Sequence, residues 1–313
     1  MENPSSHNHN GSARAAAPAV PRDDLPDTQN RHASGIQGAR VPLQEVGSSN
    51  FRLPLRYALR DGSVHTLETS VLGAVSLEAD RKGINMSRII RSFYEYRHEV
   101  ITLEVVHRIL SHYLAELEAA SARLRLAFAL PVMMPSLRSG LEGYQYYDCV
   151  IDARLNAEGI FAPLLQLGFV YSSVCPCSTD LSEHALATRG VAAIPHSQRS
   201  RARLRVVPAP GTTLEWEELI EACRHALQTE TQAMVRRTDE QAFAERNAAS
   251  QKFVEDAARL LYQALDGLAG VEAFAVSCSH LESLHSHDAV ATVTRGLPTG
   301  LWGGIDDYGE LIC

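Results

Sequence analysis

Two cysteines near the middle of the chain have the residue type and the surroundings to do chemistry. Cys175 and Cys177 flank Pro176 directly after an apolar run. Proline lacks a backbone donor and ends strand pairing, so Cys175 is expected at the rim of a sheet, where a thiolate can act. The two cysteines are too close for an ordinary zinc-chelating pair, and the sequence has no second pair to complete a structural zinc site. The alternative is that both thiols are small buried side chains.

Five segments, in one order along the chain, resemble the signature of the type IB GTP cyclohydrolases, also called the GTP cyclohydrolase IV family. The resemblance covers roughly residues 54 to 296, and the segments are Lys82–Arg88, Cys175–Ser178, His196–Arg199, Asp239–Gln241 with Phe253–Asp256, and Glu282–His287. The resemblance implies the tunnelling fold, in which antiparallel strands of several subunits assemble into a barrel with helices outside.

The same resemblance implies a metal site formed by Cys175, Glu240, Glu282 and His285. A thiolate, an imidazole and two carboxylates suit Zn(II), Mn(II) or Fe(II), with weak discrimination among the three. The sequence leaves one rival open. Cys278, His280 and Glu282 recur at every second position, so on a strand they would share a face and could bind a metal themselves.

Two histidines compete for the role of proton carrier. Imidazole titrates near neutral pH, which makes His196 the candidate, with Glu240 as a further catalytic residue that the resemblance implies. His184 lies earlier in the same segment. The interval between Cys177 and His196 is longer than the family pattern leads us to expect, and Glu183–Pro195 looks like an inserted helical turn. The choice between the two histidines therefore stays open.

Substrate recognition is expected from one carboxylate and two arginines. The resemblance gives Glu255 the task of accepting two hydrogen bonds from the ring N–H and the exocyclic amine of guanine, which adenine cannot donate. Arg88 and Arg199 are expected to bind the triphosphate, since guanidinium groups suit phosphate oxygens. The sequence has no Gly-x-x-x-x-Gly-Lys-Ser/Thr loop, which argues against a P-loop ATPase or GTPase.

Composition narrows the class of protein. The chain has 313 residues, 45% of them hydrophobic, so it can bury a substantial core. A net charge of -8 argues against a general nucleic-acid binder. No apolar run is long enough for a membrane span, and six cysteines without framework spacing are typical of reduced thiols in the cytoplasm.

Hydrophobic periodicity predicts two β-β-α-α-β-β modules, and the resemblance implies an α+β fold of antiparallel sheets with helices on one side. We expect a flexible leader at 1–50, modules at 51–157 and 158–296, and a tail at 297–313. The expected strands are 53–59 and 64–77, joined at Asp61-Gly62, then 123–132, 144–155, 160–174, 199–207, 271–281 and 288–294. One helix is expected to begin with Ser87 as its cap, and three more are expected at 102–118, 214–227 and 250–265. Open sheet edges favour a homo-oligomer, which we expect to be a homotetramer.

The resemblance thus implies a GTP cyclohydrolase that converts GTP and water to formate and 7,8-dihydroneopterin triphosphate, the entry step to folate-type pterins. One alternative is an NADPH-dependent nitrile reductase of queuosine biosynthesis, which needs a nucleophilic cysteine and no metal. Another is a metal-binding scaffold without catalytic activity, because a fold does not determine a function.

Overall fold

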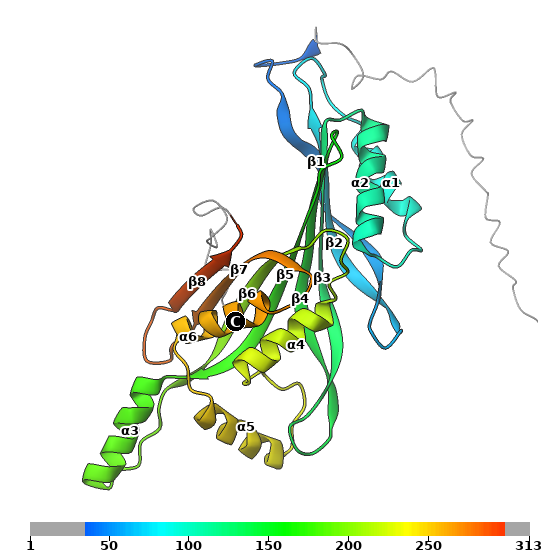
Figure 1. Cartoon of the computed structure of the whole chain (residues 1–313). Coiled ribbons are helices and arrows are strands. Elements are labelled where there is room, and N and C mark those ends of the chain that lie inside the picture. Colours follow the sequence, from blue (N-terminus) through cyan, green and yellow to red (C-terminus); the bar gives the residue numbers. More distant parts are fainter. Residues whose placement is uncertain (1–34, 298–313) are drawn as a thin grey trace, which may run out of the picture.

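The computed structural model describes residues 35–297, which form one eight-stranded antiparallel sheet and six helices (Figure 1). The strands follow one another across the sheet in chain order: β1 (Leu43–Ala58), β2 (Val64–Leu77), β3 (Ser121–Pro135), β4 (Glu142–Asn156), β5 (Phe161–Val174), β6 (Ser197–Pro208), β7 (Val271–His280) and β8 (Ala289–Arg295). The helices are α1 (Met86–Glu95), α2 (Leu103–Leu117), α3 (Pro176–Arg189), α4 (Trp216–Leu227), α5 (Arg237–Ala249) and α6 (Val254–Asp266). The expected α+β class with antiparallel strands is confirmed.

The two expected modules are halves of one continuous sheet. Strand β4 pairs with β5, with the register running from Cys149↔Leu167 to Leu155↔Phe161. The expected boundary after residue 157 lies in the turn between these strands. The first half has the expected order of two strands, two helices and two strands. The second half departs from it, because α3 is inserted between β5 and β6 and α5 lies between α4 and α6.

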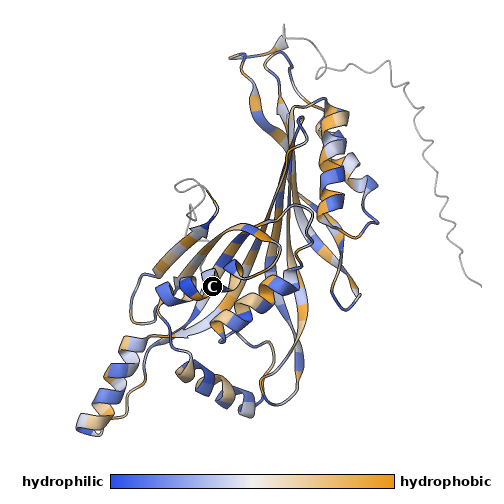
Figure 2. Ribbon diagram, in the orientation of Figure 1, coloured by the Kyte–Doolittle hydropathy of each residue, from blue (hydrophilic) through white to orange (hydrophobic). Residues whose placement is uncertain are grey.

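The core lies on the face of the sheet that the helices cover. Every second residue of β3 from Leu124 to Leu130 is buried, because successive side chains of a strand point to opposite faces. Figure 2 shows this alternation of apolar and polar residues along the strands. Helix α2 buries Ile109, Leu110 and Tyr113 against the first half, and α4 and α6 pack on the second half. No helix in the described range is long and apolar enough to cross a membrane.

Local signals set several element boundaries. The hairpin at Asp61-Gly62 forms as expected: Gly62 has a φ of 83°, and Asp61 Oδ1 accepts the Ser63 N–H at 2.8 Å. Thr102 caps α2, because its hydroxyl oxygen accepts the Val105 N–H. The prediction that Ser87 caps α1 is wrong. Helix α1 begins at Met86, and the Ser87 hydroxyl donates to the side chain of Asn85 instead.

Residues 43–50, which were expected to belong to the flexible leader at 1–50, are part of a strand. Strand β1 begins at Leu43, and Leu43↔Leu77 and Val46↔Val75 continue its pairing with β2 beyond the expected boundary at residue 50. Pairing satisfies backbone groups that a flexible segment would leave to water, so the long β2 partner accounts for the extension. Residues 1–34 and 298–313, which include nearly all of the expected tail, lie outside the described range.

Candidate functional site

Cys175 lies where β5 passes into α3. Strand β5 ends at Val174, and Cys175 is the residue that precedes the first helical residue, Pro176. Proline suits this first position, because its fixed φ fits a helix and its missing N–H would have no partner there. Cys175 is half-buried, and its main-chain N–H donates to the carbonyl oxygen of His196 at 3.3 Å. The thiol is thus at the rim of the sheet, as expected.

Helix α3 is longer than the helical turn expected at 183–195, and it starts earlier. In Figure 1 it projects from one end of the molecule. Of its residues only Ala185 is buried, and Cys177, His184 and Leu186 are exposed. His184 therefore lies on an exposed helix, whereas His196 is joined to Cys175 through the main chain.

The ring of His196 is held by a short polar chain. Its Nδ1 lies 3.0 Å from Gln198 Oε1, and Gln198 Nε2 donates to the Ser173 hydroxyl at 2.6 Å. Because an amide oxygen can only accept, this network assigns the proton to Nδ1 and leaves Nε2 as the basic nitrogen. The Ser173 and Ser200 hydroxyls, both fully buried, lie 2.8 Å apart and complete the chain. Sequence reasoning missed Gln198, although its place two residues after His196 on a strand could have suggested a shared face.

Glu282 and His285 lie at the same end of the sheet as Cys175. They follow the end of β7, where His280 pairs with Ser200 of β6. His285 Nε2 lies 3.8 Å from Glu282 Oε2, and the hydroxyl of Ser283 lies 3.4 Å from the carbonyl oxygen of Ser197. Since Ser197 is the neighbour of His196, the strand register gathers these side chains at one rim.

Glu240 occupies the first turn of α5, a helix that the sequence analysis did not predict. The preceding Asp239 is fully buried and anchors the helix to the β3–β4 loop. It accepts the main-chain N–H groups of Arg138 and Ser139 at 2.7 and 2.8 Å and the Ser139 hydroxyl at 2.6 Å. Burial acts to raise its pKa, but these hydrogen bonds, with one from the Arg236 N–H, hold the pKa of Asp239 well below its usual range. Glu240 itself is exposed.

The four expected metal ligands are not all brought together within one chain. Cys175, Glu282 and His285 share one rim, and their sulfur, oxygen and nitrogen donors suit a divalent metal. Among residues 35–297, however, no three His, Cys, Asp or Glu side chains lie close enough to hold an ion. The donor chemistry therefore fits a metal, while a single copy leaves the ligand set incomplete.

The rival trio on β7 is not a metal site. Cys278 is fully buried, and burial raises the pKa of its thiol to about 12. His280 is also buried, and its Nε2 is hydrogen bonded to the Tyr171 hydroxyl at 2.9 Å. Burial and the charge of Lys252 lower the pKa of His280 to about 4. A protonated thiol and an occupied imidazole nitrogen are poor ligands, so Glu282 has no partner for the alternative site.

The expected substrate-binding residues lie in three different places. Glu255 is exposed in the first turn of α6. Arg199 is exposed on β6, opposite Ser172 of β5. Arg88 belongs to α1, and its guanidinium donates to the carbonyl oxygen of Glu116 at 2.9 Å. Figure 1 shows α1 and α3 at opposite ends of the molecule, so one copy does not bring Arg88 to Cys175.

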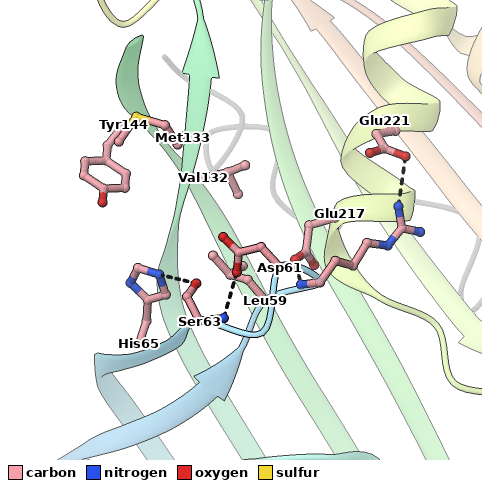
Figure 3. Close-up of a pocket in the computed structure, with 10 residues that line it drawn as sticks. Leu59, Asp61, Ser63, His65, Val132, Met133, Tyr144, Glu217 and Glu221 are labelled. Atoms are coloured by element: carbon pink, nitrogen blue, oxygen red, sulfur yellow. Dashed lines mark hydrogen bonds and ion pairs between the residues drawn. The ribbon is translucent and has the colours of Figure 1, made fainter.

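A hollow of about 530 Å³ lies away from all of these residues, between the β1–β2 turn, the β3–β4 hairpin and α4 (Figure 3). Asp61, Glu217 and Glu221 place three carboxylates on its wall, and Arg60 donates to both glutamates. A triphosphate would be repelled by this set of charges. The hollow is therefore not the binding site that the sequence analysis predicts.

Comparisons with known proteins agree with the sequence motifs. The model of the family described as "Type I GTP cyclohydrolase folE2" matches residues 25–291. The "GTP cyclohydrolase FolE2" of Roseobacter denitrificans is 54% identical over 276 residues, which is 88% of this chain and 75% of the relative. That of Cereibacter sphaeroides is 55% identical over 272 residues, which is 87% of this chain and 76% of the relative. Among solved structures, a hyper-thermostable uricase mutant is 9% identical with a TM-score of 0.46, and the match covers 82% of this chain and 94% of that one.

Proposed function

Because this chain belongs to the type I GTP cyclohydrolase folE2 family, we propose that it converts GTP and water to formate and 7,8-dihydroneopterin triphosphate. This activity makes it a hydrolase of folate biosynthesis. The observation that best supports the proposal is the placement of Cys175, His196, Glu282 and His285 at one rim of the sheet, where β5, β6 and β7 end or begin.

A divalent metal, Zn(II), Mn(II) or Fe(II), is the cofactor that these donors would hold through Cys175, Glu240, Glu282 and His285. Such an ion supplies Lewis acidity, which lowers the pKa of a coordinated water so that hydroxide is available near neutral pH. The thiolate of Cys175 is a ligand in this proposal and not a nucleophile.

Proton transfer and substrate positioning fall to the remaining residues. The Nε2 of His196 is the proton carrier, because Gln198 orients the ring and keeps the proton on Nδ1. Glu240 assists from α5. Glu255 accepts hydrogen bonds from the guanine edge and so orients purine carbon 8, while Arg88 and Arg199 bind the triphosphate.

The working enzyme is a homo-oligomer, which we propose to be a homotetramer that takes GTP and needs neither nucleic acid nor membrane. Two observations support association: Arg88 and Cys175 lie at opposite ends of one copy, and β1 and β8 each have an edge that pairs with no other strand in the described range. The five described cysteines are free thiols, which supports a reducing cytoplasm as the location.

The test is dialysis of the purified protein against a chelator, followed by assay of GTP turnover with each metal in turn. We expect the metal-free protein to be inactive and added Zn(II), Mn(II) or Fe(II) to restore formate release to differing degrees. The product mass distinguishes the linear triphosphate from a cyclic phosphate. Full formate release without metal would contradict the role of the metal, and a covalent thioimide with a nitrile substrate would instead support the nitrile reductase.

A further inference from the structure

Lys252 is a buried cation in the short connection between α5 and α6. Its side chain is 4% exposed, and it precedes Glu255 by three residues. The ammonium group donates to the Thr229 hydroxyl oxygen at 3.2 Å and to the carbonyl oxygen of Ser250. Both acceptors are neutral, and within the described range no carboxylate contributes to the pKa of this ammonium, which burial alone lowers. The sequence analysis did not identify Lys252, which is one of two lysines in the chain.

The contacts of Lys252 lead directly to the strand end that carries Cys175. Its main-chain N–H donates to the carbonyl oxygen of Val174 at 3.3 Å, one residue before Cys175. Thr229, which is fully buried, donates its hydroxyl to the carbonyl oxygen of Ser172 at 2.5 Å. The Ser172 N–H donates to the Thr229 carbonyl oxygen at 2.8 Å. Lys252 is therefore joined to the last residues of β5 twice, once by its backbone and once through Thr229.

Burying an ammonium group that has only neutral partners costs free energy of folding. Removing a charge from water is unfavourable unless an opposite charge compensates it, and burial lowers the pKa of Lys252 to about 8. An apolar side chain of the same length would fill the space at a lower cost in free energy. The charge is also felt at the end of β7, because it contributes to the lowered pKa of His280. Lys252 thus lies between the strand ends that carry the expected metal ligands and the helix that carries Glu255.

We propose that Lys252 is a positioning residue that locks the end of β5, which carries Cys175, to the start of α6, which carries Glu255. It thereby sets the separation between the metal end of the site and the carboxylate that reads guanine. This inference rests on the proposed function, because the roles of Cys175 and Glu255 belong to it. A small displacement between the two ends would misalign purine carbon 8 with the attacking water, even though Lys252 touches neither.

The test compares Lys252→Met with a matched control, Gln251→Met, in the full-length protein loaded with the metal that supports the highest turnover. Gln251 is the neighbour of Lys252, and its side chain donates to the carbonyl oxygen of Ala248, outside the connection to β5. The measurements are metal content, Tm, and kcat and KM with GTP and with inosine triphosphate, which lacks the exocyclic amine. A second pair, Thr229→Val and Thr229→Ser, removes or keeps the hydroxyl that links the ammonium to β5.

For Lys252→Met we expect an unchanged metal content, a Tm equal to or above that of the native protein, and a kcat for GTP about tenfold or more lower. The preference for GTP over inosine triphosphate should shrink, because Glu255 no longer meets the guanine edge in register. Thr229→Val should reproduce this loss and Thr229→Ser should not, while Gln251→Met stays native.

Two outcomes overturn the inference. The first is a Lys252→Met protein with native kcat and native preference between the two nucleotides. The second outcome applies if the Lys252→Met protein fails to fold: Thr229→Val and Thr229→Ser would then show the same preference for GTP over inosine triphosphate. If the native protein itself releases no formate from GTP with any metal, the proposed function fails instead, so the two failures are distinguishable.

Discussion

Cys175 differs from most other cysteines of the chain in its surroundings. Cys149, Cys223 and Cys278 are fully buried, and burial raises the pKa of each thiol above its ordinary value. A thiolate is the form that binds a metal, so these three are poor ligands. Cys175 is half-buried and Cys177 is exposed. Of these two described thiols outside the core, only Cys175 is bonded through its backbone to the segment that carries His196.

We predict that Cys175→Ala lowers metal content and turnover by at least about a hundredfold, because the softest donor of the ligand set is lost. Cys177→Ala is the matched control, since it removes an exposed thiol two residues away in the first turn of α3, and it should retain metal and most activity. Metal analysis and GTP turnover check both variants. An equal loss of activity in the two variants, with metal kept in both, would contradict the assignment of Cys175.

The burial of Lys252 predicts a dependence of stability on pH. Its pKa is lowered from 10.5 to about 8 in the folded protein, so between these values the unfolded chain binds a proton that the folded chain does not. The free energy of unfolding should therefore rise as pH increases from about 8 to 10.5, by at most about 3 kcal/mol. Below pH 8 both states are protonated, and this part of the stability is absent.

Urea unfolding at several pH values checks this prediction, with Lys252→Met as the reference. The buried tyrosines titrate in both proteins, so the difference between the two curves isolates Lys252. His280, which faces Lys252 from β7, stays neutral over this range because its pKa is about 4. With only two lysines in the chain, a titration of labelled amine resonances measures the pKa of Lys252 directly. Parallel stability curves for the two proteins would contradict the prediction.

At the scale of elements, periodicity predicted the strands because each has one buried face. The alternation along β2, β3 and β4 gave their positions, and Asp61-Gly62 gave the first hairpin. Helix α5 escaped prediction, and α3 was expected only as a helical turn at Glu183–Pro195, for the opposite reason. Each buries a single residue, Ala185 in α3 and Asp239 in α5, so neither carries an apolar stripe that a sequence pattern could reveal.

The candidate site was predictable in its residue types but not in its connections. Spacing and motif similarity indicated Cys175 and His196, whereas the choice against His184 depends on α3 projecting away from the sheet. The role inferred for Lys252 depends on hydrogen bonds to Thr229 and Val174, which lie far from it in the chain. Contacts between distant segments have no signature in a single sequence, and so this tie emerges only from the fold.

Helix α5, which carries Glu240, should depend on the carboxylate of Asp239. We predict that Asp239→Asn lowers the hydrogen-exchange protection of the Arg138, Ser139 and Arg236 amides by about tenfold or more near neutral pH. These amides donate to the carboxylate, and an asparagine keeps one acceptor oxygen of the two. Because the pKa of Asp239 is held below its usual range, its stabilising effect is complete above about pH 4 and is lost as pH falls further.

Glu245→Gln is the control for this prediction. Glu245 also joins α5 to the β3–β4 loop, through an exposed ion pair with Arg138 at 2.5 Å. Exposed ion pairs contribute little to stability, so this variant should keep native protection. The difference between Asp239→Asn and the native protein should narrow below about pH 4, because the carboxylate takes up a proton in the opened state while the folded state stays ionised. A similar loss of protection in both variants would mean that Asp239 has no special role.

At the scale of the whole molecule, the helix-free face of the sheet is charged. Arg123 forms ion pairs with Asp152 of β4 and Glu45 of β1, and Arg201 of β6 pairs with Asp148. These residues alternate with the buried core positions of their strands, which is the pattern of a sheet with one buried and one solvent-exposed face. A polar face, together with outer edges of β1 and β8 that pair with no other strand among residues 35–297, is what a sheet would need to close into a barrel with further copies of itself.

If sites form between copies, an inactive Arg88→Ala protein and an inactive Cys175→Ala protein should complement each other. A site that takes Arg88 from one copy and Cys175 from another is native in about a quarter of the positions of a random mixed oligomer. We therefore predict that joint refolding of the two variants restores about a quarter of native turnover. The physical reason is the separation of α1 from α3, which keeps these side chains apart in a single copy.

The control is a mixture of Cys175→Ala with His285→Ala, which should restore nothing, because the two side chains lie at the same rim of one copy and enter the same site together. Native mass spectrometry confirms in each case that mixed oligomers have formed. Absence of activity in the first mixture, with mixed oligomers present, would show that Arg88 does not act across a subunit boundary. Equal recovery in both mixtures would show that Cys175 and His285 serve different sites, against the grouping of ligands that the sheet register supports.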